Sequence, residues 1–443
     1  SLGGGRFSNS LVAGFSAFRD FRENAGGLAI PNIPLIDIQG PNGQNMTTFG
    51  PDPFTPNNKL NQDVIQLNNN FSMYLKNHTI TIGTANEYYR FNNVFTQIIN
   101  GNYRYNSIAD FIADSNPLTT ASARPAGYNI QFVAVQGGPE ATAAKWEALQ
   151  LGFFAQDEYT GIKNVKITGG VRVDVPLYLT DLPENNYVNA IDFNGEKLRV
   201  GAWPEVRPLI SPRIGVNWDV KGDRTTQIRG GTGVLTGRIP FVWLSNTVSN
   251  NGLYFGQFNS TNVPLTNTGD GFPYDFSLTP YVLPTDAPAS AFSDLQRGLP
   301  PLITNPLDPN FGRSAIVPAI NTVAKDFKFP QVWRSNLAVD QQLPGGIVGT
   351  LEFIYTKDLN AMFLRDANLR PAVATLAGDG RPLYGAAGGA RQILSNDRRL
   401  SGDVFQALVL DNTDEGYQWS ITAQLRKTFS ANFDLSLAYT YTD

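Results

Sequence analysis

The chain has 443 residues, and its 34 Lys and Arg against 38 Asp and Glu give a formal net charge of −4. This near balance provides no broad basic field, so nucleic acid is excluded as an expected partner. With no Cys and a single His, thiol catalysis, disulfides, thiolate metal sites and His-rich metal centres are excluded as well. The 42 Gly and 29 Pro favour a β-protein with many turns over a helical bundle or a disordered chain.

The first third of the chain has a weak pattern. Residues 11–18 alternate, although both faces of this strand would be fairly apolar. A hairpin is predicted around residues 76–78, with apolar residues at alternate positions on both sides. Residues 22–60 and 97–126 are rich in Pro, Asn and Gly and are expected to be loops.

Strict alternation begins later, in the runs 165–175, 210–220, 417–429 and 433–441. In the second run one face carries only apolar side chains, from Ile210, Pro212, Ile214, Val216, Trp218 and Val220, and the other carries Ser211, Arg213, Gly215, Asn217 and Asp219. Only a period of two produces this pattern, so these runs are predicted to be strands. Their length suits a tilted strand that crosses a bilayer.

The connections between these strands alternate in length. Short turns are predicted at 161–164, 221–224, 343–346 and 430–431, and long connections precede residues 210, 329 and 417. Antiparallel neighbours then place all short turns at one end, as outer-membrane barrels do, whereas a soluble sandwich has no reason for such sorting. The predicted fold is therefore all-β, an antiparallel transmembrane β-barrel of about twelve strands here, with long extracellular loops and short periplasmic turns.

Several stretches resemble one family. Residues 151–159 (LGFFAQDEY) followed by 167–174 (ITGGVRVD) look like a strand pair from the TonB-dependent receptors, in particular the Oar-like branch, whose members often carry an N-terminal carboxypeptidase-regulatory-like domain. Further stretches resemble the same branch in order, at 76–83, 211–215, 229–233, 332–337 and 417–442. The resemblance covers about half of the chain.

The resemblance implies a bacterial outer-membrane barrel of 22 strands, filled by an N-terminal plug and energised through TonB. No plug, TonB-contacting segment or signal peptide is recognised, so residues 1–443 are expected to be part of such a barrel, without the plug and the C-terminal strands. The expected partners are outer-membrane lipid, TonB through the plug, and other outer-membrane or surface proteins. No cofactor is expected.

The polar faces of the strands supply one set of candidate site residues. If the apolar positions contact lipid, the lumen-facing candidates are Arg172, Asp174, Arg213, Asp219, Arg229 and Arg426. They are expected to hold the plug or to line the path of a substrate. The alternative is that they only solvate the lumen.

The predicted extracellular loops at 239–329 and 359–415 supply a second set. The first of these loops is rich in aromatic residues, and the ligand candidates are Trp243, Tyr254, Phe255, Phe258, Tyr274 and Tyr281, with Phe272 and Phe276 nearby. Such rings suit carbohydrate or peptide binding, and they serve equally well for packing within the loop.

Other motifs favour structural roles. The glycines at 229–233 lack the Gly-Lys-Ser/Thr ending of a phosphate loop. Residues 411–416 (DNTDEG) offer oxygen ligands for Ca²⁺ but lack EF-hand spacing, so a solvated turn is favoured. His78 adjoins a tight turn, which favours a turn or interfacial role over a ligand role. General acid–base catalysis by a pair of carboxylates among Asp157, Glu158 and Asp174 is disfavoured, because basic residues are expected on the neighbouring strands. We therefore expect neither an enzyme nor a metal site.

The function predicted is a TonB-dependent receptor or transporter that takes up an unidentified ligand through a plugged barrel. The main alternative is a non-transporting structural barrel subunit of an outer-membrane protein assembly. A third is a secreted, soluble glycan-binding β-protein, which would remain monodisperse without detergent.

Overall fold

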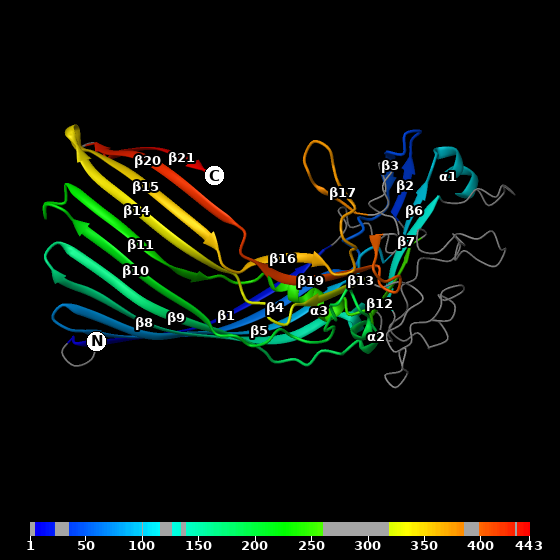
Figure 1. Ribbon diagram of the computed structural model, residues 1–443, viewed down its shortest axis with the longest axis horizontal. Helices are drawn as coiled ribbons and strands as arrows, with labels where there is room; N and C mark the ends of the chain where they lie inside the picture. The colour runs from blue at the N-terminus through cyan, green and yellow to red at the C-terminus, as the bar shows by residue number, and fades with distance from the viewer. Residues whose placement is uncertain are drawn as a thin grey trace.

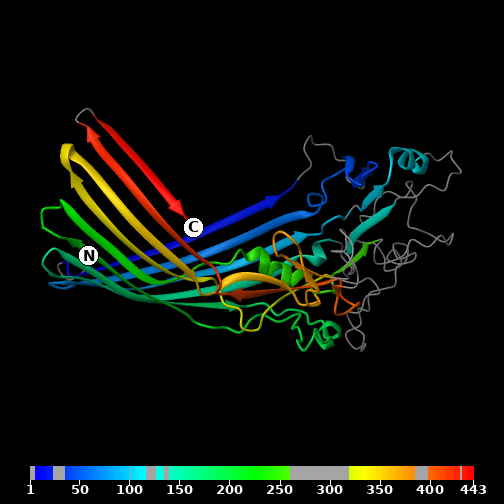
Figure 2. The same ribbon diagram turned by 45° about the horizontal axis from the view of Figure 1, so that its top comes forward.

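The computed structural model describes residues 5–22, 35–99, 101–115, 126–133, 139–259, 319–384, 398–429 and 432–443. Its main feature is one large antiparallel sheet of eleven strands, strongly curved (Figures 1 and 2). In sheet order the strands are β1 (Phe7–Phe21), β4 (Asn58–Tyr74), β5 (His78–Phe95), β8 (Ala144–Ile162), β9 (Val165–Tyr178), β10 (Leu209–Asp219), β11 (Thr226–Thr236), β14 (Gln331–Leu343), β15 (Ile347–Asp358), β20 (Tyr417–Phe429) and β21 (Phe433–Thr442).

The strands follow chain order across the sheet, and β1 and β21 are its two edges. This arrangement confirms the prediction of an antiparallel all-β fold. Eleven strands of the described residues form this sheet, close to the expected number of about twelve, and residues 11–18 belong to β1, whose neighbour in the sheet is β4. The predicted early hairpin is β4 with β5, and both strands extend well beyond the residues that suggested it.

The two ends of the sheet differ in their connections. Short turns at 75–77, 163–164, 220–225 and 344–346 all lie at one end, which we name the turn end (Figure 1). The third of these is the longest, and the fourth is a single 3₁₀ turn, η2 (Pro344–Gly346). The paired ends of β20 and β21 are at the same end, and the turn predicted at 430–431 lies outside the described residues. At the opposite end, the loop end, the strands are joined by the long connections 22–57, 96–143, 179–208, 237–330 and 359–416, parts of which lie outside the described residues. The predicted sorting is confirmed, and short and long connections are not mixed at either end.

Strand register gives the sheet two chemically different faces. Residues paired across a ladder share a face, and the row Leu337, Phe353, Ile421 and Tyr441 is apolar in every member. On this apolar face Ile214 is 52% exposed and Leu437 is 71% exposed, so no second sheet covers these side chains. The alternating positions form the polar face, on which Ser, Thr, Asn, Gln and charged residues predominate.

The connections at the loop end have secondary structure of their own, which corrects two predictions. Residues 22–60 and 97–126 were expected to be loops, yet they contribute to a five-stranded sheet and a helix. The sheet order is β12 (Phe255–Asn259), β7 (Gly127–Val133), β6 (Asn102–Tyr105), β2 (Leu35–Gln39) and β3 (Asn45–Phe49), with α1 (Ile108–Ser115) after β6. Ile36 and Ile38 pack with Tyr105 in its core. The parallel partner of β2 is β6, far away in sequence, so local composition gave no sign of it.

The remaining connections also carry short elements. They are η1 (Pro139–Thr142), α2 (Asn186–Ala190), α3 (Phe241–Ser249), a two-stranded sheet of β17 (Ala374–Thr375) and β18 (Pro382–Leu383), and a three-stranded sheet of β13 (Ala319–Val323), β19 (Gln406–Thr413) and β16 (Ala361–Asp366). The regions 239–329 and 359–415, expected to be long loops, thus contain α3, β12, β13 and β16–β19. The helices in the described residues are too short to cross a membrane.

The largest apolar core lies at the loop end of the polar face. Tyr89, Phe91 and Trp146 project from β5 and β8, and α3 packs against them through Leu244 and Val248. The Trp146 indole Nε1 donates to Ser245 Oγ at 3.0 Å, which satisfies the one polar atom of this buried ring. The helix α3, which belongs to the connection after β11, therefore lies over the polar face of the sheet.

Candidate functional site

The six charged residues predicted to share a face do so. Register pairs Arg172 of β9 with Ser211 of β10, Arg213 with Gly170 and Gly233, and Arg229 with Asn217 and Ala338. All of these residues lie on the polar face, with Asp174, Asp219 and Arg426. The alternation within each strand was enough to predict this set, because ladder pairing preserves the face.

Ion pairs fix two of these arginines. Arg172 Nε donates to both carboxylate oxygens of Asp174 at 2.9 Å, and its Nη2 lies 2.7 Å from Asp174 Oδ1. Asp174 is 2% exposed, so this bidentate pair supplies the countercharge that a buried carboxylate requires. Arg229 donates from Nε to Asp340 at 3.0 Å and from Nη1 to Glu352 at 3.3 Å, which links β11, β14 and β15.

The other three residues differ in their surroundings. Asp219 accepts backbone N–H groups of Gly222 and Arg224 at 2.9–3.2 Å, so it holds the turn between β10 and β11. Arg426 lies 3.9 Å from Asp434 and is largely exposed. Arg213 is exposed, and the described part of the chain gives its guanidinium no hydrogen-bond or ion-pair partner.

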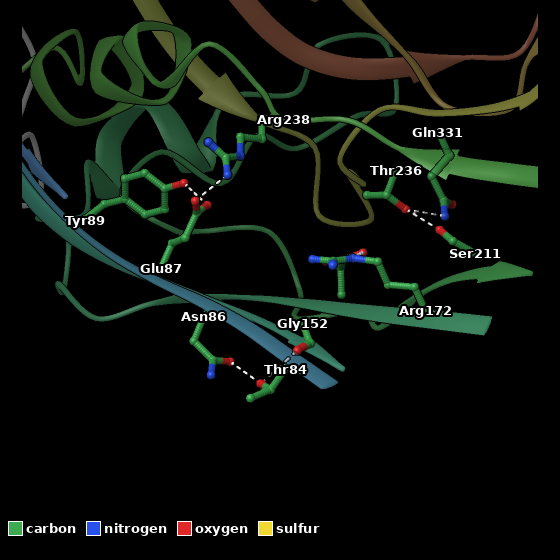
Figure 3. A network of polar contacts seen from close by, with 11 residues as sticks. Thr84, Asn86, Glu87, Tyr89, Gly152, Arg172, Ser211, Thr236, Arg238 and Gln331 are labelled. Carbon is green, nitrogen blue, oxygen red and sulfur yellow. Dashed lines mark hydrogen bonds and ion pairs between the residues drawn. The ribbon is translucent and has the colours of Figure 1, made fainter. Parts of the chain in front are cut away.

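The polar face is hollowed toward the loop end. A hollow of about 490 Å³ is bounded by β4, β5, β8, β9, β10 and β11. Its lining includes Glu87, Gln150, Arg172, Asp174, Arg213 and Arg238. Glu87 of β5 accepts hydrogen bonds from Tyr89 Oη and from Arg238, which follows β11 (Figure 3). It also accepts one from Gln66 of β4 at 2.8 Å. Across the hollow, Thr236 contacts Ser211 and Gln331 at 2.7 and 3.1 Å (Figure 3).

Sequence reasoning missed Glu87 and Arg238. Glu87 belongs to a strand whose alternation continues past the residues read as a hairpin, and following the pattern to residue 95 would have placed it on the polar face. Arg238 follows the end of β11, and nothing in the local sequence indicates that it meets Glu87 across β8–β10. The aromatic cluster at Tyr89, Phe91 and Trp146 lies beyond Glu87, further toward the loop end of β5 and β8.

The predicted aromatic ligand residues have different positions. Trp243 on α3 packs against the core cluster, Phe255 is buried, and Tyr254 is half-buried, with its pKa raised because burial disfavours the phenolate. Nothing is described of the Phe258 side chain, and Phe272, Tyr274, Phe276 and Tyr281 lie outside the described residues. Trp243 and Phe255 thus contribute packing, and a ligand role for the set stays a prediction.

One charged cluster stabilises the loop end. Arg365 of β16 donates to both oxygens of Glu196 at 2.6 and 2.7 Å and to Asp411 of β19 at 2.9 Å. Hydrogen bonds to Glu196 and then Asp411 hold the pKa of Arg365 above its usual range, although partial burial acts in the opposite direction. Asp411, considered as a calcium ligand from its sequence, is therefore engaged by an arginine.

The other motifs considered from the sequence lie on strands of the large sheet or near its turns. Residues 229–233 lie within β11 and no helix follows them directly, and the His78 imidazole Nδ1 lies 2.7 Å from Asp157 Oδ2 near the turn end. Glu158 pairs with Lys166 at 3.1 Å. In the ranges that the structure describes, no three His, Asp or Glu side chains gather in a way that could hold a metal ion.

Comparison with solved structures finds similar folds at low identity. The chain is similar to the outer membrane transporter YddB from Escherichia coli (11% identity, TM-score 0.48, 99% of this chain and 40% of that one). It is also similar to a single-residue mutant of the ferric enterobactin receptor PfeA from Pseudomonas aeruginosa (10% identity, TM-score 0.43, 98% of this chain and 41% of that one). A third similar structure is the siderophore receptor PirA from Acinetobacter baumannii (9% identity, TM-score 0.44, 99% of this chain and 42% of that one).

The chain spans about two fifths of the length of these structures. A search among curated protein sequences finds no significant match. The family model described as "Outer membrane beta barrel domain" matches residues 4–442, nearly the whole chain, and agrees with the antiparallel sheet, the apolar face and the sorted connections. This chain therefore belongs to the outer membrane beta barrel domain family and is a protein of the bacterial outer membrane.

Proposed function

We propose that residues 1–443 are part of the barrel of a TonB-dependent receptor or transporter, which takes up an unidentified ligand through a plugged bore and is not an enzyme. The observation that carries the proposal is the hollowed polar face, whose charged residues suit a wet or protein-filled bore rather than hydrocarbon. The stretches that resemble TonB-dependent receptors lie on β5, β8–β11, β14, β20 and β21, strands of the large sheet that carries this polar face.

The two ends of the sheet support a directional route. The turn end is simple, whereas the loop end carries the smaller sheets and α3. A ligand that binds among the loop-end elements would next meet the hollow beneath the cluster at Phe91 and Trp146. Movement past this point would require the plug to be displaced, which is the role proposed for TonB.

The test is binding of TonB to the full-length protein. The complete reading frame would be expressed, purified in detergent and titrated with the isolated periplasmic domain of TonB, with and without deletion of the N-terminal segment that precedes the barrel. We expect saturable binding that the deletion abolishes. A full-length protein that does not bind TonB would contradict the proposal and favour the alternative, a structural barrel subunit of an outer-membrane assembly.

A further inference from the structure

The polar face contains an arginine in a strip without neighbouring side chains. Register places Arg213 of β10 directly between Gly170 of β9 and Gly233 of β11. A Cβ at Gly170 would lie 2.8 Å from the Ala155 carbonyl oxygen, and one at Gly233 would lie 2.8 Å from that of Pro212. Side chains are therefore disfavoured at both positions, and the space beside Arg213 stays open.

A second arginine lies on the far side of the same strip. Arg334 of β14 pairs in register with Gly233, so the row across the sheet reads Arg213, Gly233, Arg334. Adjacent strands lie about 4.8 Å apart, which puts the two arginine backbones roughly 10 Å apart on one face. Arg334 bonds Thr356 of β15, on the side of β14 away from Gly233, so its side chain has to turn from Thr356 to meet Arg213 over the glycine.

These two arginines differ from their neighbours in charge balance. Arg172 and Arg229 have carboxylate partners. Arg334 donates from Nε to the hydroxyl of Thr356 at 3.0 Å, and the described residues offer no carboxylate to Arg213 or Arg334. Both residues lie within their strands, where the opposite face is apolar, so their charges belong to the bore and not to an interface with bulk water.

We propose that Arg213 and Arg334 form a site for an oxyanion, a carboxylate or phosphate group, seated over Gly233. Guanidinium groups bind such groups through paired, charge-assisted hydrogen bonds, and the glycine strip allows the anion to approach the wall. The oxyanion belongs either to a solute in the bore or to an acidic side chain from another segment of the full-length protein. The site rests on the polar face lining the bore and does not depend on TonB.

The experiment uses full-length protein in detergent, titrated calorimetrically with inorganic phosphate in a buffer free of other oxyanions. The variants are Arg213→Gln, Arg334→Gln and both together, with Arg224→Gln in the exposed turn 220–225 as matched control. Each single change is expected to weaken phosphate binding about tenfold, since each removes one set of charge-assisted hydrogen bonds. The double variant is expected to show no saturable binding, and Arg213→Lys to recover only part of the affinity because lysine lacks the fork geometry.

Thermal unfolding without added anion distinguishes the two sources. Phosphate binding that is lost in the double variant, with an unchanged unfolding temperature, identifies a solute site. Absence of phosphate binding together with an unfolding temperature lowered in the double variant, and not in Arg224→Gln, identifies an acidic side chain of the protein. If phosphate does not bind and the unfolding temperature is unchanged, or if the double variant still binds phosphate, the proposal is wrong. TonB binding, measured separately, reports on the proposed function alone.

Discussion

Arg229 illustrates how single residues stabilise the polar face. Its guanidinium lies between Asp340 and Glu352 on two further strands. Without it the two carboxylates would share one side of the wall with no countercharge. The three side chains are 22–39% exposed, so water screens part of this repulsion and the energetic effect is smaller than for a fully buried pair.

Arg229→Leu is expected to lower the stability of the full-length protein by about 1–2 kcal/mol. Thermal unfolding in detergent measures this, with Arg224→Leu in the turn as control. Permeability of proteoliposomes to a small solute, measured on the same variants, tests whether Arg229 also holds the plug or lines the path. Lower stability with unchanged permeability would leave Arg229 a residue that only solvates the lumen.

Sequence alone predicts the position of such residues better than their partners. The spacing of Arg172 and Asp174 puts them on one face of one strand, and their ion pair follows directly. The partners of Arg229 depend on the register of β11, β14 and β15, which no local pattern encodes. Glu87 and Arg238 are further apart still, and only the folded sheet brings them together.

Strands whose partners are adjacent in the chain were likewise predicted from sequence, whereas short elements whose partners are distant in sequence were missed. β10 was predicted because every second residue from Ile210 to Trp218 is apolar, and its partners are adjacent in the chain. β2 and β6 were missed because they are short, pair in parallel and lie within Pro- and Asn-rich sequence. The helix α3 was also missed, since its apolar residues are buried by β5, β8 and β13, elements distant in sequence.

Leu244 tests whether α3 is packed as described. Its side chain is fully buried in the loop-end core, whereas Val242 on the same helix is 45% exposed. Leu244→Ala is expected to cost about 2–5 kcal/mol of local stability, and Val242→Ala to have little effect. Hydrogen exchange of the α3 amides measures the difference. Equal exchange in the two variants would mean that α3 is not packed through Leu244.

At the scale of the whole molecule, the two faces of the sheet and the two kinds of connection follow from one requirement. A strand that crosses a bilayer presents alternate residues to hydrocarbon and to the bore. Ile214, Val216 and Trp218 are exposed on the apolar face, and Arg213, Gly215 and Asn217 alternate with them. This partition was predictable from sequence, whereas the secondary structure of the loop end was not.

The most direct test of this partition is cysteine scanning of β10, since the chain has no native Cys. Single cysteines at positions 213–218 of the full-length protein would carry a fluorescent label in bilayers that contain brominated acyl chains, and a water-soluble quencher would be applied in parallel. We predict lipid quenching at 214, 216 and 218 and aqueous quenching at 213, 215 and 217. Uniform quenching along the strand, or the opposite alternation, would contradict the assignment of the apolar face to lipid.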